Sequence, residues 1–297
     1  MSLSRERVYK AIKQQPLEEF VKGELIIEDE VVAKVLNKQP VGFTEKYEFI
    51  EWLGLDMVTI TPLEKEFGKE VPKASDLVFP DVEKWAATSL FTCAILDGPF
   101  EWGLRLLGLN DFFGLFRKSP QQVLELVEKI EKVNREKIRE LAGRGINGVI
   151  LADDIAFKQG LYLSPKFLRE YFFPSYARLV EEIKKQNLVA FFHSDGNYQQ
   201  VLEDIIKAGF DGLHCLDRDS GMDIKAIKKE VGKNLCLWGH LTVEDLKNAK
   251  EPEGRKKVIS FVNELSAVGG FILGTTTGIY KGIDLEGLVL LYRGREL

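Results

Sequence analysis

A histidine and a carboxylate lie close together where an apolar run of the sequence ends. His193 closes the run at residues 187–193, and Asp195 follows two positions later. A histidine beside a carboxylate can move protons or hold a metal ion, so His193 and Asp195 are predicted to be catalytic and to be the metal ligands if a metal is bound. The other two histidines, His214 and His240, also end apolar runs. The alternative is that His193 is a rim histidine that is hydrogen-bonded only for structural reasons.

Further polar side chains end apolar runs in the same way. Asp153 and Asp154 close one run and are predicted to be catalytic. Adjacent residues of an extended strand point to opposite sides, so one aspartate faces the site and the other could cap a turn. A second group is expected to line the substrate pocket: Glu24, Tyr162, His214, His240, Thr277 and Tyr280.

Eight apolar runs, separated by segments with helical periodicity, predict the fold. Parallel strands that are buried on both faces read as short continuous apolar stretches. The expected strands span residues 22–27, 56–61, 89–97, 148–154, 187–193, 210–214, 234–240 and 270–275. This alternation is typical of an α/β protein with a (β/α)₈ TIM barrel, here a single domain over residues 1–297. The polar ends of the strands would then meet at the carboxyl-terminal mouth of the barrel, where such barrels place their active sites.

Composition excludes several classes of protein. The 297 residues are 45% hydrophobic and 29% charged, with a net charge of −5, which gives no support to nucleic-acid binding. No apolar stretch approaches the roughly 20 residues of a membrane span. Three cysteines without CxxC spacing make a disulfide framework unexpected and favour a cytoplasmic protein.

Several short motifs together resemble the uroporphyrinogen decarboxylase superfamily over roughly residues 50–292. They are Asp97-Gly-Pro-Phe, the run that ends in Asp153-Asp154, Leu163-Ser-Pro-Lys-Phe-Leu-Arg-Glu, His193-Ser-Asp-Gly-Asn, Ala208-Gly-Phe-Asp-Gly-Leu, Leu237-Trp-Gly-His and Ile272-Leu-Gly-Thr-Thr-Thr-Gly. The resemblance implies a (β/α)₈ barrel. It also implies one of two activities: cofactor-free decarboxylation of a tetrapyrrole, or methyl transfer between a corrinoid protein and a thiol or another small partner.

The chain departs from the decarboxylases at the positions that would hold the substrate. Their arginine-rich first strand is replaced by the Val-Lys-Gly-Glu of residues 21–24, and the aspartate after their second strand is absent from residues 59–63. Thr277-Gly278 replaces their C-terminal His-Gly pair. A polycarboxylate would lack its ion partners here. The leading prediction is therefore an enzyme for methyl transfer, with decarboxylation of uroporphyrinogen as the alternative and a non-catalytic ligand-binding barrel as a second alternative.

The zinc-dependent methyltransferases of the superfamily carry a His-x-Cys motif and a later cysteine. His193 matches the histidine, whereas Asp195 and Thr277 stand at the cysteine positions. A thiolate-rich zinc site is therefore not available at these positions, but a site of nitrogen and oxygen ligands is chemically reasonable, with His193 and Asp195 joined by His214, His240 or Glu24 as alternatives. The resemblance further implies a corrinoid supplied by a partner protein and a small-molecule substrate. A homodimer of this chain is a further expectation. A decarboxylase of this type would need no cofactor.

Overall fold

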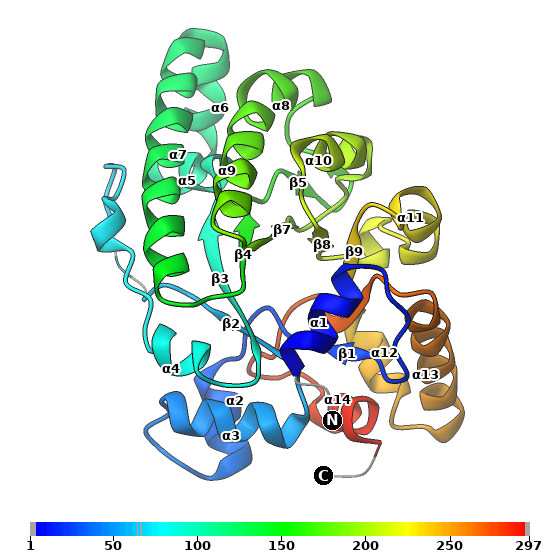
Figure 1. The fold of residues 1–297 in the computed structure, drawn as a ribbon. Coiled ribbons are helices and arrows are strands. Elements are labelled where there is room, and N and C mark those ends of the chain that lie inside the picture. The colour runs from blue at the N-terminus through cyan, green and yellow to red at the C-terminus, as the bar shows by residue number, and fades with distance from the viewer. Residues whose placement is uncertain (1–3, 64, 66, 295–297) are drawn as a thin grey trace.

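Eight parallel strands form a nearly closed barrel in the computed structural model, which describes residues 4–63, 65 and 67–294. The order of neighbouring strands is β1-β10-β9-β8-β7-β4-β3-β2, and helices surround them (Figure 1). The barrel strands are β1 (Val21–Lys22), β2 (Met57–Ile60), β3 (Phe91–Asp97), β4 (Gly148–Ala152), β7 (Val189–His193), β8 (Gly212–His214), β9 (Cys236–Leu241) and β10 (Phe271–Thr275). The predicted (β/α)₈ barrel is confirmed.

Except for α1, which precedes β1, the helices follow strands in the sequence and pack outside them. They are α1 (Ser4–Ile12), α2 (Asp29–Leu36), α3 (Phe43–Leu53), α4 (Val82–Ala86), α5 (Pro99–Leu107), α6 (Leu109–Lys118), α7 (Pro120–Gly143), α8 (Pro165–Tyr171), α9 (Phe173–Lys185), α10 (Leu202–Ala208), α11 (Ile224–Val231), α12 (Val243–Asn248), α13 (Pro252–Ala267) and α14 (Leu285–Arg293). A small hairpin, β5 (Ala156–Phe157) and β6 (Gly160–Leu161), follows β4. Ser164 caps α8, because its hydroxyl accepts a hydrogen bond from the backbone N–H of Phe167. None of the described helices is long and apolar enough to cross a membrane.

The first strand is shorter than the sequence predicted. Residues 22–27 were expected to be extended in the sheet, but only Val21–Lys22 pair with β10, and a single bridge joins Ile27 to Ile279. The chain leaves the sheet at Gly23, where a Cβ atom would lie 2.2 Å from the Met57 side chain. After this departure the next residues, which are acidic and apolar, lie toward the mouth of the barrel.

Two apolar layers hold the barrel together. Inside it, alternate residues of the strands pack with one another, including Phe91, Phe191 and Trp238. Helix α1 adds Val8 and Ala11 to this inner cluster. In Figure 1, α1 lies in front of the strands, with α7 to its left and α13 to its right. The second, larger layer lies between strands and outer helices. Burying both faces of every strand explains why the strands read as continuous apolar runs.

Candidate active site

Strand register brings four polar or small residues into one row at the mouth. Asp97 of β3 pairs with Ala152 of β4, Ala152 pairs with His193 of β7, and His193 pairs with His214 of β8. Side chains alternate between the two faces of a strand, and residues two and four positions earlier, such as Phe191 and Val189, belong to the inner cluster. Asp97, His193 and His214 therefore point to the inside of the barrel, at the ends of their strands.

Three groups that could hold a metal ion meet at this mouth. One ligand atom from each of Asp154, His193 and Asp195 lies within 4.8 Å of the others. The Nε2 atom of His193 is 3.8 Å from Oδ1 of Asp154 and 4.0 Å from Oδ1 of Asp195, too far for hydrogen bonds. The backbone N–H of Asp195 donates to Oδ1 of Asp154 at 2.8 Å, which ties the two loops together.

The other ring nitrogen of His193, Nδ1, is within hydrogen-bond distance of a second histidine. Its Nδ1 atom is 2.9 Å from Nδ1 of His214. His214 is fully buried against the edge of Trp238, with ring centroids 4.7 Å apart. Burial lowers the pKa of His214 well below its usual value, so this imidazole is neutral at physiological pH.

The two adjacent aspartates have different surroundings. Asp153 is fully buried, and its carboxylate accepts hydrogen bonds from Tyr176 Oη at 2.6 Å and from the backbone N–H groups of Phe100 and Glu101 at 3.1 and 2.6 Å. Those N–H groups belong to the first turn of α5, which begins just after the neighbouring strand β3. Asp153 therefore caps the N-terminus of α5. Asp154 faces the mouth instead, with 40% of its side chain exposed. The structure thus brings Asp154 to the candidate site and places Asp153 beneath it.

The mouth opens into a cavity of about 820 Å³ with one apolar wall. Leu63, Phe67, Leu77 and Trp102 contribute to that wall. Phe67 and Leu77 belong to the charged, proline-containing stretch 63–86 that follows β2 in the sequence. Trp102 lies on α5, and the Phe67 ring meets it edge to face at 5.4 Å. The cavity can therefore take a ligand with an apolar body.

This cavity also has charged lining residues. It carries Asp97, Glu101 and Arg105 together with Asp154 and His193. Arg105 is 3.1 Å from Asp97 and donates to Glu101 at 3.0 Å. Burial raises the pKa of Asp97 to about 6, although the positive charge of Arg105 opposes the shift. Reasoning from sequence had not assigned Asp97 or Arg105 to the site. Asp97 ends an apolar run, which was a usable signal; Arg105 lies inside a helix and gave none.

None of the six expected substrate-binding residues lines this cavity, although His214 contacts His193, which does. Four of the six lie in the outer layer or in loops: His240, Thr277, Tyr280 and Tyr162. His240 packs against Phe261 of α13 and Phe271 of β10, with ring centroids 5.1 and 5.7 Å away. Alternation along β9 would have turned His240 inward, but Gly239 and His240 have φ values of 124° and 96°, and the side chain turns to the outer layer instead. The other three lie in loops: Thr277 is exposed, Tyr280 is half-buried, and Tyr162 stacks on Phe100.

Glu24, also expected at the site, is buried beneath the mouth. It is 1% exposed, accepts hydrogen bonds from the backbone and hydroxyl of Thr275, and is bonded to the Tyr292 hydroxyl. Burial raises the pKa of Glu24 from 4.5 to about 7, against the opposing effect of these donors. Glu24 joins β10 to α14 and borders a smaller hollow of about 270 Å³ beside β2.

The buried Glu24 carboxyl should make the free energy of unfolding depend on pH. The folded protein keeps a proton that the unfolded chain has released by pH 6, so the free energy of unfolding should fall by about 3 kcal/mol as the pH rises from roughly 4 to 8. In Glu24→Gln, which keeps a neutral acceptor for Tyr292, this part of the fall should disappear. Urea unfolding at several pH values measures it. The assignment is wrong if both proteins show the same dependence over that range.

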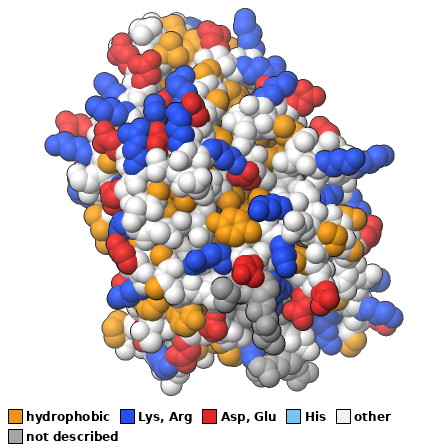
Figure 2. Space-filling view, in the orientation of Figure 1, with side chains coloured by type: hydrophobic (Ala, Val, Ile, Leu, Met, Phe, Trp, Pro, Cys, Tyr) orange, Lys and Arg blue, Asp and Glu red, His pale blue; other side chains and the backbone are white. Residues whose placement is uncertain are grey.

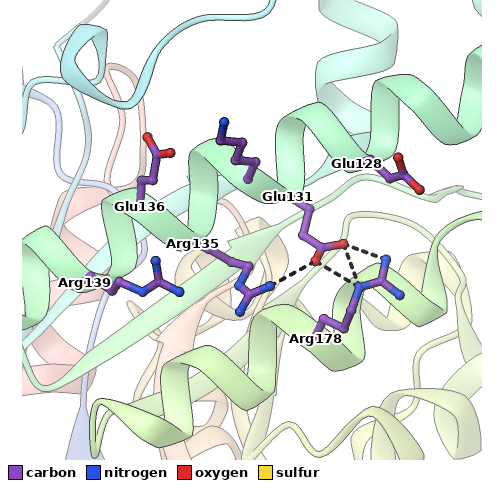
Figure 3. A pocket seen from close by; sticks show the side chains of 7 residues that line it. Glu128, Glu131, Arg135, Glu136, Arg139 and Arg178 are labelled. Carbon is purple, nitrogen blue, oxygen red and sulfur yellow. Dashed lines mark hydrogen bonds and ion pairs between the residues drawn. The ribbon is translucent and has the colours of Figure 1, made fainter.

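A second hollow of about 490 Å³ lies on the outer surface between α7 and α9, where basic and acidic side chains interleave (Figures 2 and 3). It is lined by Glu128, Glu131, Lys132, Arg135, Glu136, Arg139 and Arg178. Glu131 forms an ion pair with Arg178, with 2.6 Å between Oε2 and Nη2 (Figure 3). The buried Glu182 forms an ion pair with Arg139, with 2.7 Å between Oε2 and Nη2. These pairs neutralise one another and clamp α7 to α9, so we assign the hollow a structural role.

The candidate site fits a divalent metal ion by the chemistry of its donors. One imidazole nitrogen and two carboxylate oxygens suit zinc and related transition metals. Ligands about 2.1 Å from a tetrahedral ion lie roughly 3.4 Å apart, slightly closer than the 3.8 and 4.0 Å found here. The Asp195 side chain is 65% exposed, so a change of its side-chain rotamer could shorten its distance to His193. Three protein ligands would leave a position for substrate, as catalytic zinc sites do.

Comparison with known proteins places the barrel in a family. A family model described as uroporphyrinogen decarboxylase (URO-D) matches residues 83–293. Among solved structures, a methyltransferase from Methanosarcina mazei has a TM-score of 0.71 at 15% identity, covering 99% of this chain and 98% of its own. A sugar phosphate isomerase/epimerase from Parabacteroides distasonis (10% identity, 94% and 97% covered) and a 3-keto-D-glucoside 4-epimerase from E. coli (13%, 93% and 98%) each score 0.51. At these identities the likeness shows the fold alone. No curated protein matched significantly.

Proposed function

The chain belongs to the uroporphyrinogen decarboxylase family, and from this membership we propose that it is an enzyme of methyl transfer. The methyl group passes between a corrinoid carried by a partner protein and a small donor or acceptor bound in the mouth cavity. One observation carries the proposal: ligand atoms of His193, Asp154 and Asp195 lie within 4.8 Å of one another beside a cavity that His193 and Asp154 line, as a metal or proton-transfer site requires. The fold shared with the M. mazei methyltransferase is consistent with it.

Each residue of the site has a distinct task in this reaction. A methyl group leaves its donor without the bonding electrons, so the donor atom gains negative charge and needs a proton or a cation nearby. His193 Nε2, Asp154 and Asp195 would hold the metal, which supplies electrophilic activation of the donor or acceptor atom. Asp97, with a pKa of about 6, holds a proton on the same wall at mildly acidic pH. The apolar wall excludes water.

The cavity is poorly suited to the polycarboxylate substrate of the decarboxylases. Its described cationic lining residues are Lys65 and Arg105, and Arg105 is already paired with Asp97 and Glu101. The carboxylates of the wall would repel additional negative charge, while each unpaired substrate carboxylate would lose its hydration. Decarboxylation of uroporphyrinogen is therefore the weaker hypothesis.

Assays of metal content, methyl transfer and uroporphyrinogen decarboxylation test the proposal. The purified protein is dialysed against zinc and assayed for bound metal. Methyl transfer from methylcobalamin to a panel of thiols is measured in one direction. Methyl transfer to cob(I)alamin from methyl ethers and quaternary amines is measured in the other. Turnover in either direction that depends on zinc supports methyl transfer. Conversion of uroporphyrinogen to coproporphyrinogen would establish the decarboxylase instead. The non-catalytic barrel would be favoured if the protein binds a ligand without turning it over and if substitution of His193 leaves that binding unchanged.

A further inference from the structure

The His193–His214 contact constrains where protons sit. The two Nδ1 atoms are 2.9 Å apart, and the ring centroids are 5.0 Å apart at an angle of 41°. A hydrogen bond between two imidazole nitrogens needs a proton on one and a lone pair on the other. The state of either ring therefore decides the state of its neighbour.

The pair lies at the boundary between the mouth and the barrel interior. His193 lines the cavity, and its Nε2 faces Asp154 and Asp195. His214 is fully buried beside Trp238. The Thr275 backbone is close enough to the His214 ring to interact with it, but Nε2 of His214 has no partner that meets hydrogen-bond geometry. Of the two rings, His193 alone can reach a ligand in the cavity.

Two arrangements of the shared proton have opposite consequences. If His214 donates through Nδ1, neutral His193 carries its proton on Nε2 and cannot ligate a metal from that atom. If His193 donates through Nδ1, its Nε2 lone pair faces the two carboxylates and is available to a cation. In the second arrangement the proton of neutral His214 sits on Nε2, toward Thr275. Metal-binding histidines commonly donate their second N–H to such an acceptor, which orients the ring and strengthens the ligand.

We propose that His214 is a positioning residue that accepts the Nδ1 proton of His193 and thereby presents the Nε2 lone pair of His193 to the cavity. This role replaces the direct substrate contact expected from the sequence. It rests on the metal site of the proposed function, but it also makes a claim about the protein without metal: the His193 tautomer is set before any ion binds.

A matched pair of substitutions tests the role. In His214→Asn the Oδ1 atom of asparagine can take the place of Nδ1 as acceptor, whereas His214→Leu has a similar shape and no acceptor. Zinc affinity, measured by competition with a chromogenic chelator, should fall about 10- to 100-fold in the leucine variant and stay within about threefold of wild type in the asparagine variant. Equal affinities for the two variants would overturn the proposal.

A second measurement works on the metal-stripped protein and does not depend on the leucine variant folding. Long-range ¹H–¹⁵N NMR spectra distinguish the two tautomers of each histidine, and single substitutions assign the three signals. We expect His193 to carry its proton on Nδ1 in wild type and in His214→Asn. A proton on Nε2 of His193 in wild type would refute the proposal. If wild type binds no zinc but keeps the Nδ1 tautomer, the metal role fails while the positioning role is supported.

Discussion

His193→Ala should lower the rate of methyl transfer by about a hundredfold or more and remove stoichiometric zinc. The imidazole is the nitrogen donor of the described ligand group, and without it two carboxylates remain on a wall that already carries Asp97 and Glu101. Metal content after dialysis and methylcobalamin turnover measure the two effects. Because His193 lies at the mouth, thermal unfolding should change far less than activity.

His240→Gln is the matched control for this experiment. His240 is a buried strand-end histidine like His193, but its ring packs in the outer layer against Phe261. The control should lose stability and keep zinc and turnover when assayed below its melting temperature. Full activity in His193→Ala would contradict the proposed site. Loss of turnover with zinc retained would shift the role of His193 from ligand to proton transfer.

The strand ends were predictable because burial leaves a strong signal in sequence. Every barrel strand is covered on both faces, so each appears as an apolar run, and the first polar residue after it marks the mouth. His193 and Asp195 follow directly from that pattern. The weakest prediction was the first strand, where Val21–Lys22 make only two ladder positions before Gly23 turns the chain away.

The choice among polar residues at the mouth depends on local backbone geometry, which sequence alone does not reveal. His240 shares the pattern of His193, yet positive φ values at Gly239 and His240 reverse its direction. Pairing of His193 with His214 depends on the register between β7 and β8. Arg105 reaches the site from a helix, so no strand-end signal marks it. Such contacts arise between segments that are distant in sequence and appear only when the barrel closes.

The adjacent aspartates show how one position can separate stability from function. Gly98 lies against Asp153, and a Cβ atom there would meet the Asp153 carboxylate at 2.2 Å. This close approach lets the carboxylate reach the first turn of α5. Asp154, the next residue, has no comparable set of buried donors: the bond that it accepts comes from the exposed Asp195 loop. The two side chains therefore belong to different parts of the molecule despite their proximity in sequence.

Asp153→Ala should destabilise the protein by about 3–5 kcal/mol, because it leaves the Tyr176 hydroxyl and two N–H groups of α5 without their buried acceptor. Asp154→Ala should cost less than about 1 kcal/mol but lower zinc affinity and turnover at least tenfold. Urea unfolding, chelator competition and the methylcobalamin assay separate the two outcomes. If Asp153→Ala instead kept wild-type stability, or if Asp154→Ala kept wild-type zinc affinity and turnover, the proposed division of roles between the two residues would be wrong.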